Sequence, residues 1–193
     1  GFILARQVAE ATRAIDWQAL KGIILLHHGV FTFADDARIS YENMIDLVSR
    51  AEAFLEQRGA LTAPVKAEYS PSVDDLLALS RLRKEVSQVL GAPALINWDS
   101  GSESVGFAGL DNVADLVVRG PLTPDHTIHT KAFAAVFDGD LSAGLKEFTG
   151  RYQAYFDQHA QAHHQRLDVM PRFGIWQGKG LLTFAPDVRR LQV

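Results

Sequence analysis

The stretch Gly22–Leu55, GIILLHHGVFTFADDARISYENMIDLVSRAEAFL, decides how this chain is interpreted. Its apolar run Ile23–Leu26 predicts a buried strand, which ends at His27, His28 and Gly29. A polar turn follows, and apolar residues then recur with a period of about 3.6, which predicts an amphipathic helix. An imidazole at a strand end, beside a glycine that lets other groups approach, is well placed to bind a metal. Since neighbouring strand residues point to opposite faces, one of the two histidines can face such a site.

The same pattern sets the organisation of the first block. A helix is expected over residues 40–57, because apolar residues recur there on one face and Gly59 stands just after the pattern ends. Residues 60–71 contain two prolines and form a predicted linker. The chain therefore divides into two predicted blocks, residues 1–61 and residues 62–193.

The second block begins with a strong signal for a helix start. Ser72 can cap a helix, Asp75 lies three residues further on as in a capping box, and Gly91 can end the helix. Downstream patterns predict a strand over 94–98, a loop or edge strand over 101–109, a short helix over 110–118, an extended segment over 127–131, a long helix over 142–164 and a hairpin over 172–184. Strands that alternate with helices predict an α/β fold with a mainly parallel sheet in each block.

Composition excludes several classes of function. The chain has 193 residues, of which 47% are hydrophobic, and a formal net charge of −4, so it can form a core and has no basic surplus that would favour nucleic acid. No apolar run approaches the roughly 18 residues that a membrane span needs. The chain contains no cysteine, which excludes disulfides and thiolate metal sites and is consistent with a cytoplasmic protein.

The first residues already follow a helical pattern. Apolar side chains fall at helical spacing over residues 2–15, and Gly1 stands in the first position instead of methionine. The basic segment and cleavage site of a signal peptide are both lacking. We therefore expect this chain to be part of a longer polypeptide, and a residue left by cloning at Gly1 is the alternative.

A second candidate for chemistry is the segment Arg119–Lys131, RGPLTPDHTIHTK. A rigid, proline-containing turn that displays charged groups suits a phosphate or a sugar acid. Asp125 and His129 are spaced so that a carboxylate and an imidazole can lie side by side. We assign Arg119, Asp125, His129 and Lys131 as candidate substrate-binding residues. A solvated, proline-rich loop is the alternative interpretation.

The histidines outside this segment give weaker signals. His159 and His163 are four residues apart, so on a continuous helix they share a face and can bind a metal. The pair lacks the glutamate of the HExxH pattern, and we interpret it as part of a plain surface helix. An isolated histidine such as His28 is also more often a hydrogen-bonded structural residue than a ligand, so this alternative stays open.

Four stretches of the chain resemble the class II aldolase/adducin family, and in particular the aldolase portion of bifunctional rhamnulose-phosphate aldolase/short-chain alcohol dehydrogenases. They are the opening GFILARQVAEA, the run HHGVFTF, the segment RGPLTPDHTIHTK and the late MPRFGIWQGKGLL. The resemblance implies that residues 1–61 form the C-terminal part of a class II aldolase-like fold and that residues 62–193 form an additional α/β subdomain. The glycine-rich nucleotide loop of the dehydrogenase part is absent from the sequence.

The resemblance also implies a chemistry. In that family the histidine before the glycine is a metal ligand, and here it corresponds to His28. The implied reaction is a retro-aldol cleavage of a ketose 1-phosphate such as rhamnulose 1-phosphate, assisted by a divalent metal, commonly zinc, to give dihydroxyacetone phosphate and an aldehyde. The family takes two further metal-binding histidines and an acid/base glutamate from upstream, and no histidine precedes His27 in this sequence. We therefore expect this chain alone to be inactive, and we assign no catalytic residue.

Class II aldolases are usually symmetric oligomers, so the resemblance implies a homo-oligomer that binds a sugar phosphate. The net charge and the short apolar runs give no reason to expect nucleic acid or a membrane as a partner. Two other readings remain open. One is a non-catalytic, adducin-like domain that serves assembly, and the other is an enzyme of the same fold with another sugar-phosphate substrate. Metal content and product analysis of the full-length protein separate the three.

Overall fold

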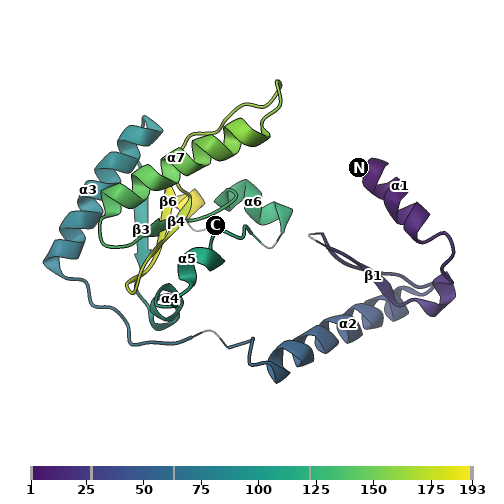
Figure 1. Ribbon diagram of the computed structural model, residues 1–193. Helices are drawn as coiled ribbons and strands as arrows, with labels where there is room; N and C mark the ends of the chain where they lie inside the picture. Colours follow the sequence, from purple (N-terminus) through teal and green to yellow (C-terminus); the bar gives the residue numbers. More distant parts are fainter. Residues whose placement is uncertain (1, 27, 63, 122, 192–193) are drawn as a thin grey trace. The chain divides into compact units, whose positions relative to one another are not determined.

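The computed structural model contains two compact units, Gly1–Leu61 and Thr62–Val193, each of which is described by itself (Figure 1). The described part of the chain leaves out residues 1, 27, 63, 122, 192 and 193, and also the side chains of Pro124 and Asp125. Of the described helices, none combines the length and the apolar character that crossing a bilayer requires.

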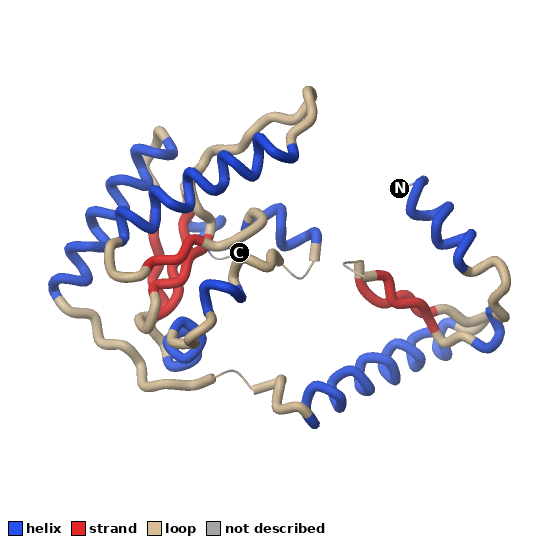
Figure 2. Tube along the Cα trace, viewed as in Figure 1, coloured by secondary structure: helices blue, strands red, loops and turns tan. Residues whose placement is uncertain are grey.

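A β-hairpin followed by a long helix forms the centre of the first unit (Figure 2). Its elements are α1 (Phe2–Ala11), a 3-10 turn (Trp17–Ala19), β1 (Gly22–Leu25), β2 (Gly29–Thr32) and α2 (Ala37–Gln57). Strands β1 and β2 pair antiparallel, with Gly22 opposite Thr32. Asp36 caps the start of helix α2, and its carboxylate accepts hydrogen bonds from the backbone N–H groups of Arg38 and Ile39.

The strand that we predicted to be buried is instead only partly buried. Within the described residues of α1, β1, β2 and α2, no side chain is buried, and Ile24 in β1 has 65% of its surface exposed. A two-stranded sheet offers too little area to bury its own apolar face. The prediction was wrong because an apolar run shows what a strand can bury, whereas burial itself depends on the layers around it.

The second unit is a sheet between layers of helices. Its elements are α3 (Val73–Leu90), β3 (Leu95–Asp99), α4 (Ser102–Ala108), α5 (Val113–Leu116), α6 (Pro124–Thr130), β4 (Ala135–Phe137), α7 (Leu141–His159), β5 (Phe173–Trp176), β6 (Gly180–Ala185) and α8 (Val188–Leu191). The strands follow the order β3-β6-β5-β4, and β4 pairs parallel to β5 while the other two pairs are antiparallel. The α/β class is confirmed, but the expected parallel sheet is wrong. The turn at Gly178 reverses the chain, and β6 inserts between β5 and β3.

Local signals at the start of this unit act as predicted. The hydroxyl of Ser72 accepts a hydrogen bond from the Asp75 N–H, and the Asp75 carboxylate accepts one from the Ser72 N–H, which completes the capping box of α3. Gly91 ends the helix with a φ of 74°, a value that favours glycine. The predicted hairpin near the C-terminal end is also confirmed, as β5 and β6.

Two segments that were not predicted to be helical are helices. Residues 102–108 form α4, because the carboxylate of Asp99 accepts hydrogen bonds from the Gly101 N–H and the Ser104 hydroxyl and thereby supports the first turn. The expected extended segment after residue 126 lies in α6, which starts with Pro124 at its first position, where proline favours a helix.

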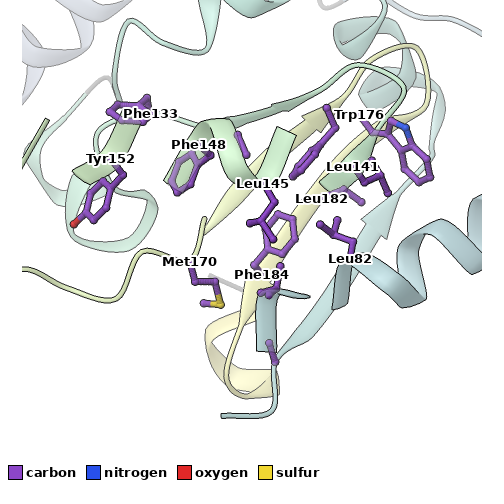
Figure 3. Packing of buried hydrophobic residues seen from close by; sticks show 14 residues of the cluster. Leu82, Phe133, Leu141, Leu145, Phe148, Tyr152, Met170, Trp176, Leu182 and Phe184 are labelled. Carbon is purple, nitrogen blue, oxygen red and sulfur yellow. The ribbon is translucent and has the colours of Figure 1, made fainter. Parts of the chain in front are cut away.

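Apolar side chains cover both faces of the sheet. On one face α3 and α7 pack against the strands, and the cluster (Figure 3) includes Leu82, Leu145, Phe148, Met170, Leu182 and Phe184. On the other face, Ala108 of α4 and Val113 of α5 pack against Ile175 of β5. Alternate residues of β5 and β6 thus serve the two clusters, and the second unit has a closed core.

The turn between β5 and β6 is tied to the start of α3. The ammonium of Lys179 pairs with the carboxylate of Asp75 and lies 5.4 Å from the ring centre of Tyr69 and 4.7 Å from that of Trp176. Burial alone would raise the pKa of Asp75, but hydrogen bonds from Lys179, Ser72 and Tyr69 hold that pKa well below its usual range. One ion pair therefore joins two segments that are far apart in the sequence.

Candidate functional site

A cavity of about 580 Å³ lies between the segment after α5 and the helix α7. The first segment lines it with Val118, Arg119, Gly120, Pro121, Thr127, Ala132 and Phe133, and α7 lines it with Arg151, Ala154, Tyr155 and Gln158. The volume is within the range of roughly 300–1,000 Å³ that is usual for small-molecule sites. The segment that the sequence singled out therefore borders a cavity of suitable size, together with one face of α7.

The charge at this cavity is positive. Arg119 and Arg151 are both exposed, and neither forms an ion pair with any carboxylate that the structure describes. The described lining includes no aspartate or glutamate. Two guanidinium groups without carboxylate partners make this cavity suitable for an anion.

The floor of the cavity is aromatic. The rings of Phe133 and Tyr155 meet edge to face, with their centres 5.9 Å apart. The guanidinium carbon of Arg151 lies over the Phe133 ring, 4.5 Å from its centre, which is a cation–π contact. This contact holds the guanidinium at the cavity, and no described hydrogen bond uses its N–H groups.

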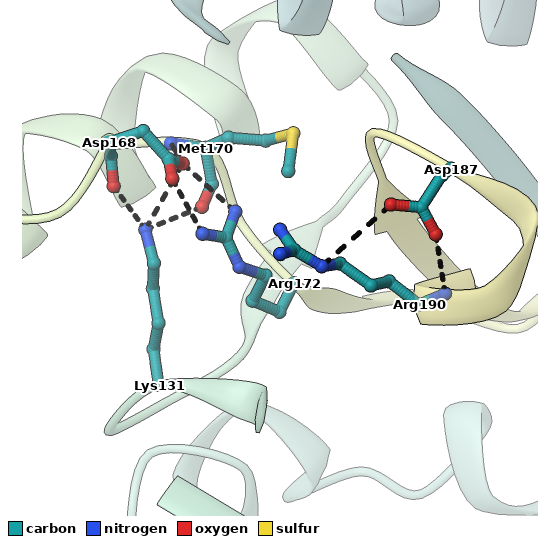
Figure 4. A network of polar contacts seen from close by, with 6 residues as sticks. All are labelled: Lys131, Asp168, Met170, Arg172, Asp187 and Arg190. Carbon is teal, nitrogen blue, oxygen red and sulfur yellow. Dashed lines mark hydrogen bonds and ion pairs between the residues drawn. The ribbon is translucent and has the colours of Figure 1, made fainter. Parts of the chain in front are cut away.

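Lys131, the fourth candidate substrate-binding residue, is buried. Its ammonium donates hydrogen bonds to the backbone carbonyls of Asp168 and Met170, the latter at 2.7 Å, and lies 3.7 Å from the Asp168 carboxylate (Figure 4). It also lies 4.1 Å from the ring centre of Tyr152. The ammonium is therefore engaged by acceptors of the protein, and Lys131 does not line the cavity.

These contacts connect the end of α6 to the segment before β5. Burial lowers the pKa of the Lys131 ammonium to about 8, although the nearby charge of Asp168 acts in the opposite direction. Arg172 forms a two-point ion pair with Asp168, with N–O distances of 2.9 and 2.6 Å. Lys131 has a φ of 64°, which is uncommon for a residue with a side chain and is held here by the buried network.

The other two residues of the predicted set lie in α6. His129 is in its last turn and exposed, and it does not line the cavity. The backbone of Asp125 belongs to the same helix, but its side chain lies outside the described part of the structure, so the predicted contact with His129 stays a prediction. A neighbour, His126, has its Nδ1 atom 2.7 Å from the hydroxyl of Thr123.

His28, the candidate metal ligand, lies in the turn between β1 and β2 and is exposed. Its Nδ1 atom is 3.3 Å from the backbone carbonyl oxygen of Leu26. His27 lies outside the described residues. Among the side chains that the structure describes, no three His, Asp or Glu residues are grouped so that they could hold a metal ion. The described residues therefore do not complete a metal site at His28.

The histidines near residue 160 do not form the helical pair that their spacing suggested. Helix α7 ends at His159, so His163 does not continue its face. The ring of His159 packs on Tyr155 with centres 4.9 Å apart, and the rings of His163 and His164 are in contact with each other. The described contacts of these three histidines are ring contacts at the end of α7 and in the segment after it.

Arg151 was missed by the sequence analysis. Its spacing carried a usable signal, because Arg151, Ala154, Tyr155 and Gln158 follow the i, i+3, i+4, i+7 pattern of one helix face. The sequence could not show that this face meets the segment at Arg119, since that contact depends on the tertiary fold.

Comparisons with known proteins place this architecture in a family. Residues 74–193 match the family described as "Aldolase class II, second domain". The chain is also 23% identical over 202 residues to an uncharacterized oxidoreductase, YuxG of Bacillus subtilis (strain 168). That alignment covers 95% of this chain and 29% of YuxG, so the chain spans less than a third of this relative. No solved structure matches the chain. On the family match, which covers well over half of its residues, the chain belongs to the class II aldolase family.

Proposed function

We propose that this chain is part of an enzyme that cleaves a ketose 1-phosphate, rhamnulose 1-phosphate in the first instance, into dihydroxyacetone phosphate and an aldehyde. The family match over residues 74–193 is the observation that carries this proposal, since it supports an aldolase-type function. The sugar-phosphate class is supported by Arg119, which lines the cavity of the second unit and pairs with no carboxylate that the structure describes.

The reaction is a retro-aldol cleavage. The bond between C3 and C4 of the ketose breaks, the hydroxyl on C4 loses its proton as the aldehyde carbonyl forms, and C3 takes up a proton to give dihydroxyacetone phosphate. We propose that Arg119 binds the substrate phosphate and that His129 and Asp125 lie near the sugar. Lys131 is proposed to hold the end of α6 in place through its contacts with Asp168.

We propose that only the full-length protein binds the metal of this enzyme. We infer that His28 supplies one ligand to a divalent ion, zinc in the first instance, and that the remaining ligands come from polypeptide outside this chain. An exposed histidine in a hairpin turn is free to take that part. The chain of 193 residues is therefore proposed to be inactive by itself, and the active form to be a cytoplasmic homo-oligomer.

The name of the relative supports a further part of this proposal. YuxG is named an oxidoreductase, and this chain corresponds to 29% of it. We propose that the aldolase part described here occurs in one polypeptide with an oxidoreductase part, which would act on the small aldehyde or ketone compounds that the cleavage supplies.

The full-length protein tests the proposal directly. Dihydroxyacetone phosphate released from rhamnulose 1-phosphate is measured directly by phosphorus-31 NMR, without added nicotinamide cofactor, and bound metal is measured on the same sample. We expect release of product by the intact protein, loss of metal and of product in His28→Ala, and no release by the 193-residue chain. An intact, metal-loaded protein that cleaves no ketose 1-phosphate contradicts the proposal and favours the adducin-like assembly role.

A further inference from the structure

We propose that the cavity lined by residues 118–121, 127, 132 and 133 and by helix α7 binds the phosphate group of a small sugar phosphate between two arginines, Arg119 and Arg151, with the sugar lying beside the exposed ring of Tyr155. The choice of a sugar phosphate rests on the proposed function. The binding itself is a property of the second unit, and it is measured without any catalysis.

Two arginines from separate elements line one cavity. Arg119 follows α5, whereas Arg151 lies in the middle of α7, and both are among the lining residues. Neither guanidinium pairs with a carboxylate among the described side chains. Two other arginines of this unit, Arg172 and Arg190, do pair with aspartates. What sets Arg119 and Arg151 apart is that both line the same cavity, where they can bind an external anion.

The position of Arg151 is prepared before any ligand binds. Its guanidinium lies over the ring of Phe133, a buried residue whose exposed fraction is 8%. Among the described residues no hydrogen bond uses the N–H groups of Arg151, so they can donate to the oxygen atoms of a ligand. Because the Arg151 side chain is already ordered, less conformational entropy is lost when a ligand binds, and this raises the affinity.

The number of charges favours a phosphate monoester over a carboxylate. A phosphate monoester carries a charge of about −1.5 to −2 near pH 7 and offers three acceptor oxygens, which suits two guanidinium groups. A carboxylate carries one charge and two oxygens, and one arginine satisfies it. The hydroxyl of Thr127 and the amide of Gln158 also line the cavity and can bond the hydroxyls of a sugar.

The buried contacts of Lys131 hold the two sides of the cavity in place relative to each other. Lys131 follows α6 directly and is bound to the carbonyls of Asp168 and Met170, while the next two residues line the cavity. Tyr152, whose ring lies beside the Lys131 ammonium, belongs to α7, the helix that carries Arg151. Both walls therefore meet at one buried point next to the cavity.

The test is a titration of the 193-residue chain followed by two-dimensional amide NMR, with dihydroxyacetone phosphate as the probe. We expect shifts at residues 118–121, 127–133 and 151–158. Arg119→Ala and Arg151→Ala are each expected to weaken binding roughly tenfold or more, the usual loss for a hydrogen bond to a charged group. Arg81→Ala removes an exposed arginine of α3 that does not line the cavity, and its affinity is expected to stay within about twofold of the parent chain.

Three matched ligands define the chemistry. Unphosphorylated dihydroxyacetone is expected to cause no shifts at the cavity, glycerate tests a single carboxylate, and inorganic phosphate tests the anion without the sugar. Equal binding of glycerate and dihydroxyacetone phosphate would overturn the phosphate assignment. Shifts that spread over the other basic side chains, or that survive in both arginine variants, would overturn the site. Binding lost in these variants, with no ketose cleavage by the full-length protein, would leave this site standing and refute the proposed lyase.

Discussion

The two units of this chain are built from equally regular elements, yet they differ in what those elements bury. In the second unit, side chains such as Phe137, Leu182 and Ile175 have no exposed surface. In the described part of the first unit, large apolar side chains such as Ile24 and Phe31 keep half or more of their surface in contact with water. A fully buried side chain of this kind contributes about 1.5–3 kcal/mol, so the cohesion of the chain resides in the second unit.

The difference shows that local sequence signals determine helices and turns but do not determine whether a core forms. Both units begin their long helices with an N-cap, at Asp36 and at Ser72, and both contain a tight hairpin turn. These signals define elements in either unit. Only the second unit adds helices on both faces of its sheet, and this extra layer turns regular elements into a core.

The largest expected contrast comes from removing one ring in each unit. Phe137→Ala empties a site that is completely buried and is expected to lower the free energy of unfolding by about 3–5 kcal/mol. Phe31→Ala removes a ring that is 50% exposed and is expected to cost less than about 1 kcal/mol. Urea unfolding followed by near-ultraviolet circular dichroism measures both. Equal losses would break the contrast between the units.

The buried ammonium of Lys131 gives the second unit a pH dependence. Its pKa is about 8 in the folded chain because burial disfavours the charge, against 10.5 for a free lysine. Between these values the unfolded chain holds more protons, so the stability of the parent chain rises with pH. Relative to Lys131→Met, we expect a rise of up to about 3 kcal/mol between pH 8 and 10.5. A difference that stays flat over this window would show that the ammonium is not buried.

A pair of lysine variants sharpens the contrast for ion pairs. Lys179→Met leaves the carboxylate of Asp75, a buried residue, without its cation and is expected to cost about 2–3 kcal/mol. Lys21→Met breaks a pair with Asp46 in the first unit in which both side chains are exposed, and it is expected to cost less than about 1 kcal/mol. Both are measured at neutral pH by urea unfolding. A larger loss of unfolding free energy for Lys21→Met than for Lys179→Met would contradict the claim that the second unit is the more stable one.

The smallest expected effect on stability is that of His28→Ala. The side chain is exposed and its described contact is a single long approach to a backbone carbonyl, so the change is expected to stay within about 0.5 kcal/mol. Thermal unfolding of the 193-residue chain measures it. A clear loss of stability would assign His28 a structural role and remove it from the proposed metal centre.

The sequence predicted the local features that depend on residues adjacent in the chain. The capping box at Ser72, the helix end at Gly91 and the hairpin before Gly180 depend on a few adjacent positions, and all are present. The direction of the sheet was not predictable in this way, because the insertion of β6 between β3 and β5 joins segments that are far apart in the chain. The exposure of Ile24 in β1 was missed because burial of a strand depends on the layers that the fold places around it.

In the candidate site, too, the local features were predictable from the sequence and the tertiary contacts were not. The segment from Arg119 to Lys131 was recognisable from its prolines and charges, and it does border a cavity. The partner wall with Arg151 comes from a helix that meets this segment only after folding. The sequence predicted Lys131 to be a substrate-binding residue, and only the tertiary fold shows that Asp168 and Met170 bind its ammonium in the interior.

Hydrogen exchange of the 193-residue chain, with and without dihydroxyacetone phosphate, tests the central claim most directly. That claim is that the second unit is the cohesive body and carries a phosphate-binding cavity. We expect the slowest amides to lie in β5, β6 and α7, those of β1 and β2 to exchange far faster, and the ligand to add protection at residues 118–133 and 151–158. Equal protection of β1 and β2, or ligand protection confined to other parts of the chain, would contradict it.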